Sequence, residues 1–353
     1  MTKGIWFSVA CIVLACANAA DVSSASSGLQ SVTVAEVGGT KLTRADFEKK
    51  VAGKLFQAQN TYHESERRVL DELIDELLLE QQAAKEGLTV SALLDKHVNS
   101  KVAKDPSDDA LRVYYEGLDT KESFEAVRDK ILEHLRMRRA NKIKAAYLES
   151  IRKQGQIRVL LAPPRANVSV GSLPVRGNVN APVTIIEYAD YECPFCQQIQ
   201  PALDKLEANY ADRLAFAYKD VPLPVHANAQ KAAEAKHCAG AQGKYWEYHD
   251  ALAKTKQFDA GSLKQHARTL QLDTQAFDQC LDSGQKASVI QAHVTEAQGL
   301  GLQGTPSFFI NGRFFSGALT YEKLQEVVEE ELANSSSKST GQKTAAVCCS
   351  TKP

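Results

Sequence analysis

The chain has 353 residues, of which 44% are hydrophobic and 24% charged, and its formal net charge is −1. This length predicts two domains, each large enough to bury its own core. The near-zero charge excludes the broad positive field that recruits nucleic acid, so no nucleic-acid partner is predicted.

The N-terminus has the pattern of an export signal. Lys3 precedes an apolar segment over 5–15, and the small residues 17–19 follow, which predicts a signal peptide over 1–19 and a periplasmic location. The segment is too short to span a bilayer comfortably. The run ending at Cys16 also resembles a bacterial lipobox, so a lipid anchor at Cys16 remains an alternative to the soluble form.

Residues 31–161 have a mainly helical pattern. A strand and turn come first, and apolar residues at helical spacing then predict four helices, over 45–56, 64–86, from Asp105-Pro106, and over 123–153. Pro163-Pro164 interrupts this pattern. The Pro, Gly, Asn and Ser residues of 162–180 predict a linker into a second domain.

Residues 181–333 alternate predicted strands and helices. The order is a strand over 183–188, a helix over 194–210, a strand over 214–219, a helical region over 227–299, two strands, and a helix over 321–332. Asn311-Gly312 separates the apolar runs 307–310 and 313–316, which predicts a β-hairpin. The polar tail over 334–353 is expected to be disordered.

Cys193 and Cys196 form a CxxC motif directly after a predicted strand. Cys193 would begin the following helix, where the helix dipole and free N–H groups favour a thiolate. Cys196 would lie one turn inside, close enough to attack a mixed disulfide on Cys193. A zinc site needs a second pair of ligands nearby, and the chain offers none, so neither a metal nor an organic cofactor is predicted.

The other cysteines suggest different roles. Cys238 and Cys280 lie in the helical region and, in an oxidising compartment, suggest a structural disulfide; two buried free thiols are the alternative. The adjacent Cys348 and Cys349 could bind Cu(I), pass electrons to the CxxC pair, cross-link chains, or have no role.

Four motifs in order make residues 168–333 resemble the DsbA-like family of exported thiol–disulfide oxidoreductases. They are Cys193-Pro-Phe-Cys196, Lys219-Asp-Val-Pro-Leu-Pro-Val-His226, Gly243-Lys-Tyr-Trp-Glu-Tyr-His249 and Gly304-Thr-Pro306. The resemblance implies an α/β thioredoxin fold with an inserted helical subdomain, preceded by a mainly α-helical N-terminal domain. It also makes Cys193 the attacking thiol and Cys196 the resolving one.

The resemblance implies four further site residues. Thr305 and Pro306 match the family's cis-proline loop, which lies opposite the CxxC motif and offers backbone groups to a substrate. Glu187 matches a buried acid beneath the active site, and Lys219 matches a lysine that often pairs with it. A structural ion pair at the sheet edge is the alternative for Glu187 and Lys219.

Residues 31–161 resemble, more loosely, the N-terminal region of SurA-like periplasmic chaperones. The resemblance is carried by Val37-Gly-Gly-Thr-Lys-Leu-Thr-Arg-Ala-Asp-Phe47, Leu70-Asp-Glu-Leu-Ile-Asp-Glu-Leu-Leu-Leu-Glu80 and Val113-Tyr-Tyr115. It implies binding of unfolded chains; an arm that assembles a homo-oligomer is the competing interpretation.

Together these features predict an exported enzyme that forms or reshuffles disulfides in periplasmic proteins and exchanges electrons with a membrane redox partner. Its substrates would be unfolded or disulfide-containing exported proteins. The alternative is a non-enzymatic periplasmic chaperone or copper-handling protein that uses its cysteines as metal ligands.

Overall fold

The structure, a computed structural model, describes residues 31–102 and 104–345. The predicted signal peptide, the lipobox at Cys16 and the Cys348-Cys349 pair lie outside the described residues. The chain divides into two compact units, one combining the residues up to Gln59 with those from Pro164 on, the other made of Asn60–Pro163. The boundary falls within helix α2 (Arg44–Glu86), whereas the sequence pattern placed 31–161 in a single domain.

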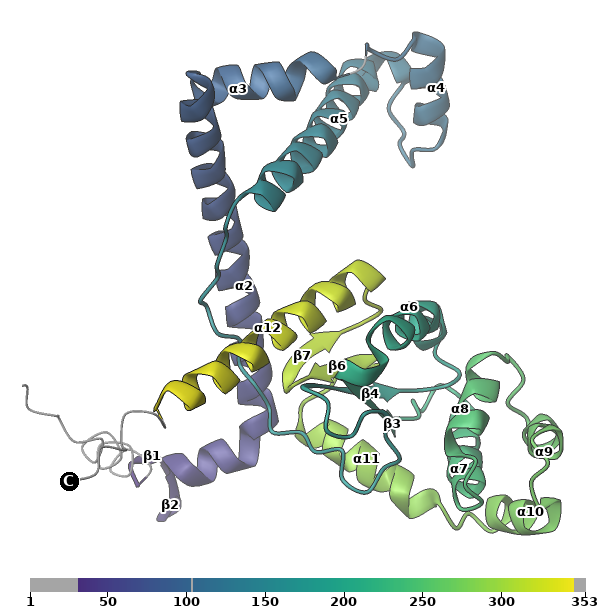
Figure 1. Cartoon of the computed structure of the whole chain (residues 1–353). Helices are drawn as coiled ribbons and strands as arrows, with labels where there is room; N and C mark the ends of the chain where they lie inside the picture. Colours follow the sequence, from purple (N-terminus) through teal and green to yellow (C-terminus); the bar gives the residue numbers. More distant parts are fainter. Residues whose placement is uncertain (1–30, 103, 346–353) are drawn as a thin grey trace, which may run out of the picture. The chain divides into compact units, whose positions relative to one another are not determined.

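The unit Asn60–Pro163 is helical. Besides the second half of α2 it contains α3 (Val90–His97), the 3₁₀ turn η1 (Asn99–Lys101), α4 (Asp108–Glu116) and α5 (Phe124–Gln154) (Figure 1). Each of α3, α4 and α5 begins after a hydroxyl side chain that accepts a backbone N–H, supplied in turn by Thr89, Ser107 and Ser123. Such caps replace hydrogen bonds that a helix end lacks, and so they fix where each helix starts.

Two separate strand groups occur in the other unit. The hairpin β1 (Thr33–Val37) and β2 (Thr40–Thr43) stands alone. A five-stranded sheet has the order β3-β5-β4-β6-β7, with β3 (Arg176–Gly177), β4 (Val183–Ala189), β5 (Leu214–Asp220), β6 (Ser307–Ile310) and β7 (Arg313–Ser316). Strands β4 and β5 are parallel, while the other neighbouring pairs are antiparallel. The predicted hairpin joins β6 to β7, and Asn311 and Gly312 both have positive φ, as a tight hairpin turn requires.

Helices cover both faces of this sheet (Figure 1). The helices after β4 are α6 (Pro194–Tyr210), which the 3₁₀ turn η2 (Ala211–Arg213) follows, α7 (Ala229–Gly240), α8 (Tyr245–Ala253), α9 (Ala260–Thr269), α10 (Thr274–Asp282), α11 (Ala287–Gly299) and α12 (Tyr321–Ala345). The larger core packs α6, α7, α8 and α12 against one sheet face, and a smaller core packs α11 against the other. This confirms the predicted α/β fold with helices inserted between β5 and β6.

The start of α2 belongs to the smaller core of the sheet. Phe56 packs against Phe309 and Phe314, with ring centroids 6.2 and 6.3 Å apart. The Gln57 side-chain amide donates a 3.0 Å hydrogen bond to the carbonyl of Leu300. A Cβ at Gly53 would overlap backbone atoms at the end of α11, so only glycine permits this approach. Residues far apart in the chain therefore complete one core.

The C-terminal tail differs from its prediction. The sequence predicts disorder from residue 334, whereas α12 continues to Ala345. Residues 334–345 contain no proline, the residue that most strongly ends a helix, so the helix can continue past the last core positions.

Candidate active site

Cys193 occupies the N-cap of α6, and Pro194 is the first residue of the helix. Proline suits this position because the first helical N–H has no partner within the helix. The Cys193 carbonyl accepts 3.1 Å hydrogen bonds from the N–H groups of Cys196 and Gln197. Both thiols are free and buried, whereas the intervening Phe195 is 60% exposed. The sequence thus places the Cys193 sulfur at the positive end of a helix, next to an exposed apolar side chain in the chain.

The loop before β6 lies against Cys193. The Thr305–Pro306 peptide bond is cis, and the Cys193 thiol donates a hydrogen bond of 3.4 Å to the Thr305 carbonyl oxygen. The two residues are 112 positions apart in the chain, and they meet because β4 and β6 are antiparallel neighbours. This contact brings the cis-proline loop to the sulfur, as the sequence motifs imply.

Glu187 is fully buried on β4, and its Oε2 lacks a hydrogen-bond partner among the described residues. Burial raises its pKa to about 8, against the attraction of Lys236, which lowers it. Burial, and then the charge of Glu187, also raise the pKa of the Cys196 thiol well above its usual range. A cavity of about 10 Å³, the size of one water molecule, is lined by Glu187, Cys196 and the rings of Tyr191 and Tyr218. Glu187 and Cys196 therefore border the same small cavity.

Lys219 does not pair with Glu187, so the predicted ion pair is wrong. In the parallel register Glu187 lies opposite Tyr218 and Tyr188 opposite Lys219, and neighbouring residues of a strand point to opposite faces. Lys219 instead lies on the smaller-core face, where its ammonium is 2.6 Å from Glu296. No catalytic role follows for Lys219 from this position.

Asp190, which the sequence analysis did not single out, shapes the loop before the motif. The buried Asp190 carboxylate accepts hydrogen bonds of 2.8 Å from the N–H groups of Glu192 and Leu223, and it lies 2.7 Å from His226 Nδ1. Asp190 thus joins the segment before Cys193 to the segment after β5. Glu192 bonds to Asn228 through both carboxylate oxygens. The sequence signal that could have indicated Asp190 is an acidic residue directly after a strand and three residues before a CxxC motif.

Cys238 on α7 and Cys280 on α10 form a disulfide, with their Cα atoms 5.9 Å apart. It joins two of the inserted helices and leaves Cys193 and Cys196 as the free pair among the described residues.

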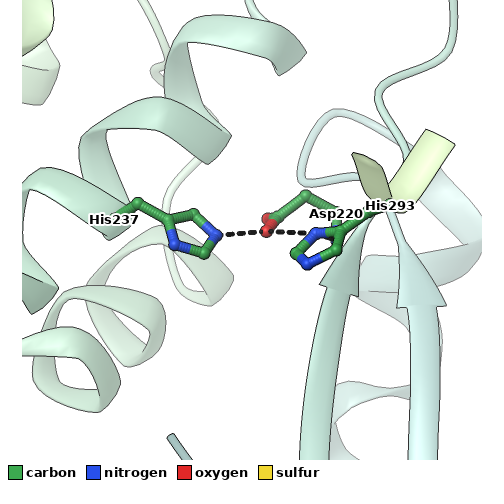
Figure 2. A group of neighbouring side chains, drawn as sticks. All are labelled: Asp220, His237 and His293. Atoms are coloured by element: carbon green, nitrogen blue, oxygen red, sulfur yellow. Dashed lines mark hydrogen bonds and ion pairs between the residues drawn. The ribbon is translucent and has the colours of Figure 1, made fainter. Parts of the chain in front are cut away.

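One group in the described chain has the residue types of a metal site. Asp220, His237 and His293 place possible ligand atoms within 4.8 Å of one another. In Figure 2 the Asp220 carboxylate lies between the two imidazoles, and the distances from its Oδ2 are 2.8 Å to His237 Nε2 and 3.6 Å to His293 Nδ1. The Lys236 ammonium lies 2.7 Å from the other carboxylate oxygen, an ion pair without hydrogen-bond alignment. The carboxylate is thus already neutralised by a cation of the chain itself.

Comparison with known families agrees with this geometry. Residues 169–330 match the family model described as thioredoxin, and residues 1–140 match the SurA-like N-terminal domain. The chain therefore joins a region that matches the SurA-like N-terminal domain to a region that matches the thioredoxin family model. The thioredoxin fold and the cysteine pair support an oxidoreductase role.

The similar proteins reported below each match less than half of the chain. The chain is 39% identical over 162 residues to a Na(+)/H(+) antiporter NhaA 3 of Salinispora tropica, a match that covers 45% of this chain and 25% of that protein. The chain thus spans about a quarter of the length of the curated relatives it matches. Among the described residues, no helix combines the length and apolar character needed to cross a membrane.

Solved structures with a similar fold include the oxidised form of BdbD from Bacillus subtilis, which is 24% identical in sequence to this chain. The match covers 48% of this chain and 97% of that chain, with a TM-score of 0.45. Another is the catalytic domain of ScsC from Proteus mirabilis, with 26% identity, coverages of 47% and 92%, and a TM-score of 0.39.

Proposed function

We propose that the protein is an exported thiol–disulfide oxidoreductase that forms or reshuffles disulfides in periplasmic proteins through Cys193 and Cys196. The observation that carries this proposal is the contact of the Cys193 sulfur, at the start of α6, with the Thr305 carbonyl of the cis-proline loop. Helix dipoles favour a thiolate at this end, and the exposed Phe195 beside it offers an apolar contact to a substrate chain.

In the oxidising direction, a substrate thiolate attacks the Cys193 sulfur of the Cys193–Cys196 disulfide, and Cys196 leaves as a thiolate. A second substrate thiolate then attacks the substrate sulfur of the mixed disulfide, and Cys193 leaves. The substrate loses two electrons, the protein gains them, and a membrane redox partner would remove them. In the reverse direction, Cys196 attacks the Cys193 sulfur of a mixed disulfide and releases a reduced substrate.

Glu187 fits the proton step of this cycle. A buried Cys196 thiolate is costly because burial disfavours the charged form. Glu187 borders the same small cavity, and its raised pKa lets it hold or release a proton near neutral pH. The pair can therefore pass a proton as Cys196 changes between thiol and disulfide.

The helical unit would hold the client chain. On the part of α2 after residue 60, Tyr62, Val69, Leu73 and Leu77 are each more than half exposed. An apolar row of this kind supports binding of unfolded chains or pairing with a second copy. Replacing Leu73 and Leu77 by Glu is expected to weaken binding of a reduced, unfolded client; a fall in oligomeric state instead would favour the homo-oligomer.

Two cysteine variants test the redox proposal. Cys193→Ser is expected to abolish thiol–disulfide exchange, and Cys196→Ser is expected to accumulate a mixed disulfide with a cysteine-containing client. The control, Cys238→Ala with Cys280→Ala, removes the other pair and is expected to retain exchange under conditions in which circular dichroism shows the variant to be folded. Full exchange activity in Cys193→Ser would refute the proposal. Equilibration with glutathione then gives the direction: a potential near about −120 mV indicates an oxidase, and about −180 mV or lower an isomerase or reductase.

A further inference from the structure

Lys236 is a buried lysine in the domain that carries Cys193 and Cys196, residues 181–333, which we call the redox domain. It lies on α7, its side chain has no exposed surface, and its ammonium is 2.7 Å from Asp220 Oδ1. Three tyrosine rings surround the same ammonium, with centroids 3.9 Å away for Tyr218, 4.8 Å for Tyr245 and 5.5 Å for Tyr191. Burial lowers the pKa of Lys236 to about 8, against the attraction of Asp220, which raises it. Below that pH the ammonium is charged, and the ring faces around it attract the cation.

Asp220 is held from several elements. His237 on α7 bonds its Oδ2 at 2.8 Å (Figure 2). His293 on α11 accepts a 3.2 Å hydrogen bond from the Asp220 backbone N–H. Burial opposes its charge, but Lys236 and these histidines together hold the pKa of Asp220 far below its usual range. Because the Asp220 carboxylate is held in position, it also holds the position of the Lys236 ammonium beside it.

The tyrosine cage connects Lys236 to the redox centre. Tyr191 and Tyr218 contribute rings both to the cage and to the small cavity that contains Glu187 and Cys196. Lys236 attracts the charge of Glu187. Lys219, the lysine expected to do this from the sequence, faces the opposite side of the sheet.

We propose that Lys236 is a positioning residue of the redox centre, whose caged ammonium favours the charged form of Glu187 while Cys196 exchanges its proton. This rests on the proposed function for its biological meaning, but the electrostatic claim can be measured without catalysis. No bond is made or broken by Lys236, which acts through its charge.

The other titratable groups around Lys236 do not supply a competing positive charge near Glu187. Burial raises the pKa of Tyr191, Tyr218 and Tyr245, which keeps them neutral. Burial lowers the pKa of His249 on α8 well below its usual value, and it also lowers that of His237 on α7. The charged groups facing Lys236 are therefore Asp220 on β5 and, once ionised, Glu187 on β4.

The test measures the ionisation of Glu187 directly, as the carboxyl carbon signal in an NMR pH titration of the reduced protein. Glu187→Gln identifies the signal by deleting it. Lys236→Met removes the charge but keeps the apolar length of the side chain, and is expected to raise the Glu187 midpoint by about one pH unit. The matched control is Lys231→Met, on the same helix, whose charge pairs with Glu234 and which is expected to leave the midpoint unchanged.

A second variant guards against misfolding, because Lys236→Met leaves Asp220 buried without its cation. Lys236→Met with Asp220→Asn removes both charges and is expected to keep a smaller upward shift. An unchanged Glu187 midpoint in either folded variant overturns the proposal, as does an equal shift in Lys231→Met.

Exchange kinetics give a second readout. The pH profile of mixed-disulfide release is expected to move upward in Lys236→Met, and this movement is expected to vanish in the Glu187→Gln background. If it persists there, Lys236 acts by another route and the proposal fails. If no variant or wild-type protein exchanges disulfides, the proposed function fails while the Glu187 titration still decides the role of Lys236.

Discussion

Removing the Cys238–Cys280 disulfide should destabilise the redox domain substantially. The two residues are 42 positions apart, and in the chain-entropy model a loop of this length, once closed, stabilises the folded state by about 4 kcal/mol. Both cysteines are buried among apolar side chains, so Cys238→Ala with Cys280→Ala adds only a small packing loss. The expected loss in the free energy of unfolding is therefore close to the contribution of loop closure, about 4 kcal/mol.

Urea unfolding without reductant measures this loss. The sequence has two tryptophans, Trp6 and Trp246. Trp246 lies on α8, one of the inserted helices, and packs against the larger core, so its fluorescence follows the unfolding of these helices. With a urea m-value of about 2 kcal/mol/M, a loss of about 4 kcal/mol moves the midpoint down by about 2 M. The control, Cys193→Ala with Cys196→Ala, keeps the long loop closed and should not show this shift. A loss below about 1 kcal/mol at an unchanged m-value would refute the loop-closure reasoning.

Three further changes test other parts of the structure. Burial raises the pKa of Glu187 from 4.5 to about 8, so the folded state binds this proton more tightly than the unfolded state does. The free energy of unfolding should therefore fall as the pH rises from about 4.5 to 8. In urea titrations at several pH values, Glu187→Gln should flatten that fall. Gly53→Ala should lower the free energy of unfolding by about 1–3 kcal/mol, because its Cβ would overlap the backbone at the end of α11, although alanine has the better helix propensity. Gly299→Ala should lower it little in the same assay, because its Cβ meets open space. Lys219→Met should destabilise the fold by removing the partner of Glu296 but leave the Glu187 NMR midpoint in place; a shifted midpoint would contradict the assignment of these residues to opposite faces.

Local signals in the sequence predicted much of the redox domain. Cys193 could be placed at a helix start because an apolar run precedes it and a proline follows. The hairpin was predicted because Asn311-Gly312 suits positive φ. These signals involve residues close together in the chain, and so they need no knowledge of tertiary packing.

The partner of Glu187 could not be predicted in the same way. Which face of the sheet a residue occupies depends on the register between β4 and β5, which the sequence alone does not reveal. Lys236 lies in a helix that the sequence pattern gives no reason to place beside Glu187. The boundary within α2 was missed for a related reason: residues 54–86 contain no glycine or proline, so nothing local marks where one unit ends.

The packing of α2 on the sheet has a consequence for how the protein is made. The hydrogen bond from Gln57 to Leu300 joins residues 243 positions apart. During synthesis the first turns of α2 emerge early, and they have no surface to cover until α11, β6 and β7 have followed. The redox domain can therefore finish folding only when nearly the whole chain has been made. A fragment that begins at Pro164 would lack Phe56, which packs on Phe309 and Phe314, and these exposed rings would favour association with other chains.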